Sequence, residues 1–447
     1  MIARPATLTS RTPETTWRGA VASSLRFSVP LRHGDGSPER LELFARAVRA
    51  DAPGSEELPW LLFLQGGPGF PALRPAGGAS GWLGELLPRF QVLLLDQRGT
   101  GGSSAVEAAT LRALGTPEAQ AEYISHFRAT DIVADAEAVR QALAIERWST
   151  LGQSYGGFIT LSYLSLAPAS LERCLITGGL GEIRGDAAAV YRATYARMAE
   201  REAEFFSWFP EDEARLQRVY DVVRERRAAG SPQHLADGSE VTETTVQRLG
   251  MFLGGNGRVQ GLHFALESAV VEAPEGARLS AGFLGVLQGQ LDHAGHPLYW
   301  LLQESIYSSG APTAWAASRV RAADFPEFLP NAPRPRLLGE MALPSDYEES
   351  VALRPLAPLA WLLAEHEGWP ALYRPEVLAE NTVPVAAAVY THDVYVDREL
   401  SLATAAAVRG LRVWESDQLH HDGLSDEPGT VLGALLELTD AAAPAQR

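Results

Sequence analysis

The sequence predicts an α/β fold, in which helices flank a mostly parallel sheet. Four short segments are apolar throughout, as is typical of strands buried on both faces of such a sheet; they read LPWLLFLQGG, RFQVLLLDQRG, WSTLGQS and LERCLITGG. Between the second and third, apolar side chains recur at helical spacing in residues 130–145, with Thr130 or Asp131 as the expected N-cap. Strand alternating with helix predicts right-handed crossovers and therefore parallel strands.

The chain divides into three zones. Residues 1–180 carry the alternating pattern, and residues 181–375 are rich in helical spacings of Arg, Glu, Ala and aromatic residues. Residues 376–447 resume the first pattern, with VPVAAAVYTHD and LRVWESD as further strands. We therefore expect one α/β core interrupted by a mainly helical cap. The stretch FLGGNGRVQGLHF at residues 252–264 does not predict a nucleotide-binding loop, because no strand clearly precedes it and its glycine spacing is wrong.

Composition excludes several classes of function. The net charge of −17 argues against nucleic acid as a partner, and the chain has no run of about 18 apolar residues that would predict a membrane span. All 38 basic residues are arginine, so mechanisms that need a catalytic lysine, such as Schiff bases or phosphate-binding P-loops, are excluded. The histidines lack metal-ligand spacing, so we expect no metal and no cofactor.

Cysteine usage bears on the cellular compartment. Cys174 is the only cysteine, which rules out an internal disulfide and fits a reducing cytoplasm. The N-terminal stretch MIARPATLTSRTPETTWRGA contains no apolar region of the kind a secretory signal needs. We therefore expect a cytoplasmic protein, and the sequence leaves its oligomeric state open.

The motif that carries most chemical information is GQSYG at residues 152–156, which matches G-x-S-x-G. A nucleophile elbow holds its serine in a strained turn between a strand and a helix, so the residues two positions away on each side must be small. The motif alone is weak, but here a predicted strand precedes it and a predicted helix follows. We therefore predict Ser154 as a nucleophile.

A second glycine-rich loop follows an earlier strand, in LFLQGGPGF. Glycines there let backbone N–H groups approach the negatively charged oxygen of a tetrahedral intermediate. In folds built on a nucleophile elbow, one donor comes from this loop and the other from the residue after the nucleophile. We therefore predict an oxyanion hole made by Gly67, with Gly66 beside it, and Tyr155.

The remaining members of a catalytic triad must follow in the order acid, then histidine. Asp393 follows the predicted strand VPVAAAVYTH, and His421 follows the predicted strand LRVWESD, in the loop QLHHDGL. Asp393 would orient and stabilise the imidazolium, while His421 would deprotonate Ser154 and then protonate the leaving amine.

Other residues compete for these two roles. Asp397 and Asp417 could supply the acid, but each lies farther from a strand end or on the wrong loop. His420 is adjacent to His421, and reasoning from the residues barely separates the two. His392 is next to Asp393 and is equally consistent with an ordinary histidine on a surface loop.

With these residues assembled, the chain resembles the proline iminopeptidase (prolyl aminopeptidase) family, whose members are serine peptidases of the α/β-hydrolase fold. The resemblance runs from about residue 40 to about residue 435. Its motifs are QGGPG, DQRGTGGSS, GQSYGG, LLQESIYSSG, LLGEMALP, VAAAVYTHDVYVD and HDGL, in the family's order. The first three are individually specific, and the others add to them through that order.

The resemblance selects Ser154, Asp393 and His421, and it favours His421 over His420 because His421 directly precedes Asp-Gly-Leu. It also implies that carboxylates bind the free α-amino group of a small peptide substrate. The matching position is Glu304, with Glu340 as the second. A carboxylate pair facing an ammonium would reject blocked N-termini, because a neutral acetamide leaves the acids unpaired.

The chain departs from the family pattern in three places: Gln65 stands where a histidine is usual, His392 where an acid is usual, and GEMALPSDY lacks expected aromatic residues. These departures bear on substrate preference more than on reaction class. The leading hypothesis is a serine aminopeptidase that releases an N-terminal residue, preferably proline, from short unblocked peptides. The alternatives are a carboxylesterase or amide hydrolase on the same core, and a non-catalytic binding protein of the same fold.

Overall fold

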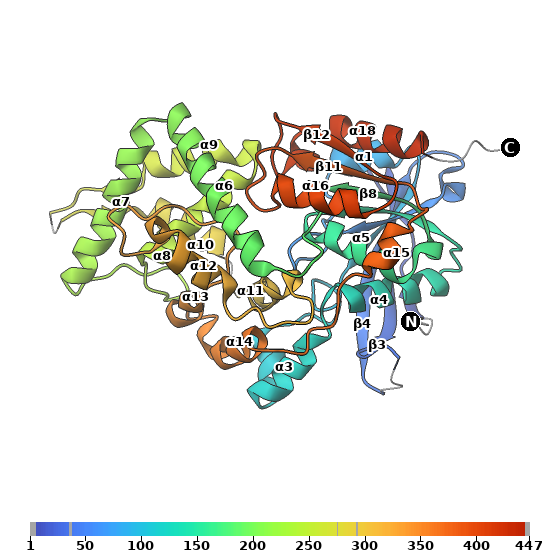
Figure 1. Cartoon of the computed structure of the whole chain (residues 1–447), viewed down its shortest axis with the longest axis horizontal. Coiled ribbons are helices and arrows are strands. Elements are labelled where there is room, and N and C mark those ends of the chain that lie inside the picture. Colours follow the sequence, from blue (N-terminus) through green and yellow to red (C-terminus); the bar gives the residue numbers. More distant parts are fainter. Residues whose placement is uncertain (1–5, 35–37, 275, 292–293, 443–447) are drawn as a thin grey trace.

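The computed structural model describes residues 6–34, 38–274, 276–291 and 294–442, and within them a mostly parallel sheet forms the centre of one of two lobes (Figure 1). Its strand order is β1-β3-β4-β6-β5-β7-β8-β11-β12, with β2 paired to β3. The strands are β1 (Thr7–Arg11), β2 (Thr15–Trp17), β3 (Ala20–Pro30), β4 (Arg40–Ala50), β5 (Trp60–Leu64), β6 (Gln91–Asp96), β7 (Trp148–Gln153), β8 (Leu171–Thr177), β11 (Val385–Tyr390) and β12 (Leu411–Ser416). From β6 to β12 every pairing is parallel. The α/β prediction is confirmed.

Helices cover both faces of this sheet, as the buried strands require. Along β5, Leu62 and Leu64 face a core shared with α4 and α5, while Leu61 and Phe63 face a second core shared with α1 and α18. This alternation explains why the strand is apolar at every position. The helices of the α/β core are α1 (Gly81–Leu86), α2 (Ala108–Ala113), α3 (Pro117–Ser125), α4 (Ala129–Ala142), α5 (Tyr155–Leu166), α15 (Pro375–Ala379), α16 (Arg398–Ala407), α17 (Gly423–Asp426) and α18 (Pro428–Asp440).

The N-cap predicted for the helix within residues 130–145 is wrong. The helix α4 begins earlier, at Ala129, and its N-cap is Arg128, which makes no side-chain capping bond. Thr130 and Asp131 lie inside the first turn. Arg128 is instead buried, where its guanidinium donates to the Ser305 carbonyl at 2.8 Å, so tertiary packing decides this helix start.

The sequence analysis missed an antiparallel extension of the sheet. Strands β3 and β4 pair over eleven residues each, and β4 then joins the parallel strands through antiparallel pairing with β6. The signal was present in the sequence of β3, AVASSLRFSVP, in which apolar and polar residues alternate along LRFSV. In the structure the same side chains alternate between buried and half-buried positions. Such alternation is typical of a strand with only one fully covered face.

A mainly helical segment lies between β8 and β11 in the chain and packs beside the sheet as a separate lobe, which Figure 1 shows in green to orange. It comprises α6 (Ala187–Trp208), α7 (Glu211–Ala228), α8 (Glu243–Gln247), α9 (Asn256–Glu267), α10 (Ala281–Leu291), α11 (Pro297–Leu302), α12 (Ala316–Asp324), α13 (Pro344–Glu349), α14 (Ala357–Ala364) and the short pair β9 (Val270–Val271) and β10 (Arg278–Leu279). We call this lobe the cap. None of the described helices is long and apolar enough to cross a membrane.

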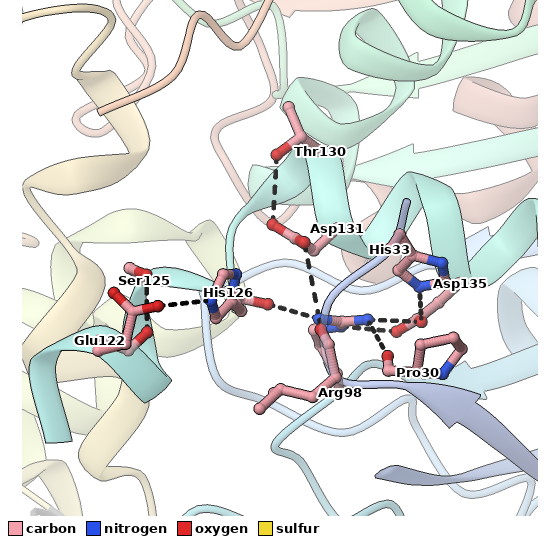
Figure 2. Close-up of polar contacts among 10 residues, drawn as sticks. Pro30, His33, Arg98, Glu122, Ser125, His126, Thr130, Asp131 and Asp135 are labelled. Atoms are coloured by element: carbon pink, nitrogen blue, oxygen red, sulfur yellow. Dashed lines mark hydrogen bonds and ion pairs between the residues drawn. The ribbon is translucent and has the colours of Figure 1, made fainter. Parts of the chain in front are cut away.

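The buried side chain of Arg98 links both the antiparallel and the parallel part of the sheet to helix α4. Arg98 follows β6, and its guanidinium forms a two-pronged ion pair with Asp135 of α4, with both N–O distances at 2.7 Å (Figure 2). His33 Nε2 lies 2.8 Å from the same carboxylate. The remaining Arg98 donors reach the carbonyls of Pro30, at the end of β3, and of Leu31 and His126. Every charged group here is therefore paired, as burial demands.

We predict that Arg98→Met destabilises the fold by about 3–5 kcal/mol, because it leaves the Asp135 carboxylate buried without its charge partner. The measurement is urea unfolding. As a matched control, Arg192→Met removes the exposed pair with Asp324 and should cost less than about 1 kcal/mol. Equal losses in the two variants would contradict the assignment of Arg98 as an anchor.

Candidate active site

Ser154 occupies a strained turn between β7 and α5. Its backbone angles are φ 54° and ψ −125°, outside the regions that non-glycine residues normally adopt. A Cβ on Gly156 would overlap the Leu64 carbonyl oxygen, and a Cβ on Gly152 would overlap the Gly156 carbonyl oxygen. The two glycines of the motif are therefore required by the closeness of the backbones around the serine.

Asp393 and His421 form a buried pair at the carboxyl ends of β11 and β12. His421 Nδ1 lies 2.9 Å from Asp393 Oδ2 and 3.1 Å from Oδ1. The backbone N–H groups of Tyr395 and Val396 also donate to Asp393 Oδ1, at 2.9 and 3.0 Å. These bonds fix the carboxylate, which in turn sets the tautomer and orientation of the imidazole.

Two consecutive glycines separate this pair from the serine turn. A Cβ on Gly178 would lie 3.2 Å from His421 Nδ1, and one on Gly179 would lie 2.5 Å from the Ser154 carbonyl oxygen. The structure thus brings Ser154, Asp393 and His421 to one place at the sheet edge. Within the described residues no hydrogen bond joins Ser154 Oγ to His421, and in free enzymes this bond is often long.

The competing residues occupy other positions. Asp397 caps α16 through the N–H groups of Glu399 and Leu400. Asp417 is exposed beyond β12, and His392 is exposed as well. His420 is buried, and in the described part of the chain neither of its ring nitrogens has a hydrogen-bond partner. Burial lowers the pKa of His420 to about 4, so it stays neutral beside the Asp393–His421 pair.

The predicted oxyanion-hole residues surround the serine. A Cβ on Gly66 would lie 2.9 Å from the Ser154 Cβ and 3.5 Å from its Oγ, so this loop passes directly over the Ser154 side chain. Tyr155 is the first residue of α5, where helix geometry leaves the backbone N–H without an intrahelical acceptor. Gly67 adopts φ 124° within the same loop, and the Gln65 carbonyl accepts from Gln97 Nε2 at 2.9 Å, which holds the loop start.

Glu340 lines a cavity of about 220 Å³ between the cap and the glycine-rich loop. Within the described residues no hydrogen bond or ion pair reaches its carboxylate. Burial raises the pKa of Glu340 to about 7, and the positive charge of His421 opposes this rise. The other lining residues, which the sequence analysis did not single out, are Phe70, Arg248, Met251, Gly289, Gln290, His296, Tyr299 and Trp300.

Glu304 is buried, whereas Glu340 is half-buried, and the Glu304 carboxylate already accepts hydrogen bonds. Its oxygens accept hydrogen bonds from the backbone N–H groups of Ala316 and Ala317, at 3.1 and 2.9 Å, at the start of α12. Burial raises the pKa of Glu304 to about 7, and these bonds oppose the rise. Gln303 Nε2 donates to the Glu340 carbonyl at 3.3 Å, so the two segments are adjacent, although within the described residues no hydrogen bond joins the two carboxylates.

No cluster of three or more His, Cys, Asp or Glu side chains in the described ranges could hold a metal ion. Among the residues that line the cavity, Phe70 could have been predicted from the sequence, because it directly follows the glycine-rich loop. The aromatic residues of α11 carry no local signal of this kind.

The strained serine, the buried histidine–carboxylate pair and the sheet that carries them define an α/β hydrolase, and a family model of the alpha/beta hydrolase fold matches residues 59–247. The chain belongs to the proline iminopeptidase family within that class. A proline iminopeptidase of Aeromonas sobria is 40% identical over 415 residues, covering 92% of this chain and 95% of that protein. Proline iminopeptidase aneH of Aspergillus aculeatus is 34% identical, covering 94% and 93%.

Solved structures are more distant. The proline iminopeptidase of Mycobacterium smegmatis matches 93% of this chain and 99% of its own, with a TM-score of 0.42 and 16% identity. This TM-score and identity are too low to support a conclusion about the site. The family assignment depends on the sequence relatives.

We predict that a fluorophosphonate reagent labels Ser154 faster as the pH rises through about 9. Burial disfavours the charged imidazole, but the Asp393 carboxylate outweighs it and raises the pKa of His421 to about 9, so the neutral base predominates only above that pH. Because Glu340 contributes to the same rise, Glu340→Gln should move the midpoint to lower pH. The measurement is labelling rate against pH; a wild-type midpoint near the ordinary histidine value, or an unmoved midpoint in the variant, would contradict this reading.

Proposed function

We propose that the protein is a prolyl aminopeptidase, which hydrolyses the N-terminal residue, preferably proline, from short unblocked peptides through an acyl-enzyme. The observation that carries the proposal is the Asp393–His421 pair beside a serine held on a strained turn. The full-length relatives at 40% and 34% identity supply the substrate class, since both are proline iminopeptidases.

In the proposed mechanism, Ser154 Oγ attacks the first peptide carbonyl while His421 Nε2 takes its proton. Asp393 holds Nδ1–H and stabilises the imidazolium. The developing oxyanion accepts hydrogen bonds from the backbone N–H groups of Tyr155 and of the loop at Gly66 and Gly67. His421 then protonates the leaving amine, and water, deprotonated by the same histidine, hydrolyses the acyl-enzyme.

We assign recognition of the free N-terminus first to Glu340. It is the carboxylate that faces both the cavity and His421, and its side chain has no partner among the described residues. Glu304, which the family resemblance implied as the first of the two positions, becomes the second carboxylate in this proposal, contributing less because both of its oxygens already accept hydrogen bonds. The aromatic walls of the cavity, including Phe70 and Tyr299, suit an apolar ring such as that of proline.

We further propose a small peptide with a free N-terminus as the partner and the cytoplasm as the location. The lone cysteine, Cys174, is buried, and burial raises the pKa of its thiol to about 12, so it is chemically inert. Carboxylesterase or other amide hydrolase activity on the same triad, and binding without catalysis, are the alternatives that the experiments below separate.

We predict that Ser154→Ala lowers kcat toward proline β-naphthylamide by at least about 10⁴-fold, since removal of the nucleophile abolishes the acyl-enzyme route. Steady-state kinetics measures the loss, and fluorophosphonate labelling should vanish in the same variant. An active Ser154→Ala protein would refute the mechanism. Failure of the reagent to label the wild-type protein would favour binding without catalysis.

We predict that N-acetylproline β-naphthylamide is a far poorer substrate than the free form, because a neutral amide leaves the Glu340 carboxylate unpaired. Glu340→Gln should lower kcat/KM for the free substrate by about 100-fold. The ratio of kcat/KM for the free substrate to that for the blocked substrate should therefore fall. The matched control Glu367→Gln, at an exposed position, should change neither value. Equal turnover of free and blocked substrates, or rapid p-nitrophenyl ester turnover without amide turnover, would instead favour an esterase.

A further inference from the structure

The glycine-bearing stretch of the cap, residues 252–258, lies against the two loops that carry Asp393 and His421. It joins a 3-10 helix (Arg248–Gly254) to α9, and no strand precedes it. Asn256 Nδ2 donates to the Gln418 carbonyl at 3.0 Å, just before the catalytic histidine loop. We call residues 252–258 the docking segment.

The first glycine of the docking segment faces Tyr395. A Cβ on Gly254 would lie 2.5 Å from atoms of the Tyr395 ring. That ring stands edge-on to the His421 imidazole, with centroids 4.9 Å apart, and its hydroxyl donates to the Met251 carbonyl at 3.2 Å. The cap therefore holds one side of the aromatic wall against which the catalytic imidazole rests.

The second glycine faces the residue that follows His421. A Cβ on Gly255 would overlap the carboxylate of Asp422, so only glycine allows the cap backbone to approach this closely. From the first turn of α9, Arg258 Nε lies 2.6 Å from Asp422 Oδ2. Steric fit and an ion pair thus act together on the histidine loop.

We propose that Arg258, with the close approach of Gly254 and Gly255, positions His421: the docking segment clamps Tyr395 and Asp422 and thereby aims the imidazole at Ser154. This inference rests on the proposed serine-hydrolase function. Arg258 is a positioning residue, since it acts through Asp422.

The geometry explains why such a clamp is needed. Asp393 holds the His421 ring through Nδ1 alone, and contact at one ring atom leaves the rest of the ring free to tilt about it. A misplacement of about 1 Å in a reacting group can cost about 100-fold in rate. Because the Arg258 and Asp422 side chains are 39% and 22% exposed, their ion pair contributes little to stability, which leaves orientation as its main effect.

The test uses the full-length enzyme and variants Arg258→Met, Arg258→Lys and Asp422→Asn. We expect Arg258→Met to lower both kcat for proline β-naphthylamide and the fluorophosphonate labelling rate by about 10- to 100-fold, with KM little changed. Its thermal midpoint should shift by less than about 4 °C. Arg258→Lys should restore most of the rate, and the double variant Arg258→Met with Asp422→Asn should lose no more than either single variant.

Gly255→Ala tests the steric half of the clamp independently of charge. It should reproduce the loss of labelling rate, because the added methyl group displaces Asp422. The matched control is Gly285→Ala in α10, where a Cβ would meet nothing within 4 Å, and it should leave kcat and labelling unchanged.

The outcomes separate the two proposals. A wild-type protein that the fluorophosphonate reagent does not label would refute the proposed function itself. A labelled wild type, together with Arg258→Met and Gly255→Ala variants labelled at the same rate, would overturn the positioning role alone. Loss of rate that Arg258→Lys does not rescue would overturn the assignment to the ion pair.

Discussion

The strained backbone at Ser154 is the constraint on which the rest of the site depends. A non-glycine residue at positive φ costs of order 1–3 kcal/mol and persists only where its surroundings over-determine it. Here the Ser154 N–H donates to the Thr177 carbonyl at 3.0 Å, and Gly157 N–H donates to the Ser154 carbonyl at 2.8 Å. Strands β7 and β8 are thereby fixed in register at the point where the serine leaves the sheet. Parallel pairing then carries β11 and β12 to the same edge, which is why Asp393 and His421 arrive there.

In the two proposals, the cap contributes to catalysis as well as to substrate selection. Glu340 reaches the cavity from the cap, and the docking segment reaches the histidine loop from the same lobe. Packing of the cap on the core therefore positions both Glu340, the proposed partner of the substrate ammonium, and His421, the proposed base. The docking segment itself meets the histidine loop through close backbone approach and the part-exposed Arg258–Asp422 ion pair, so this contact adds little stability while it constrains geometry.

Much of the fold and of the candidate site could be predicted from the sequence, because the residues that define each feature are close together in the chain. Runs such as WLLFL are buried on both faces, so they identify their strands without knowledge of neighbours, and the elbow at Ser154 is defined by five consecutive residues. The start of α4 was not predictable, because Arg128 is drawn into the cap by partners that lie far along the chain. The Arg258–Asp422 pair could not be predicted for the same reason: the two residues lie far apart in the sequence, and only the folded chain shows that Gly255 leaves room for the Asp422 carboxylate.

The buried Glu304 and the half-buried Glu340 show how environment separates residues that look alike in sequence. Burial raises the pKa of each carboxylate to about 7, but Glu304 receives two backbone N–H groups while the Glu340 side chain has no partner among the described residues. A carboxylate in that condition gains most from an arriving cation. Its negative charge also helps to raise the pKa of His421, so an ammonium that neutralises Glu340 cancels this contribution and lowers the pKa of the histidine. In the proposed complex, binding of a free N-terminus therefore pairs the Glu340 carboxylate and shifts the pKa of His421 downward, while the larger effect of Asp393 persists.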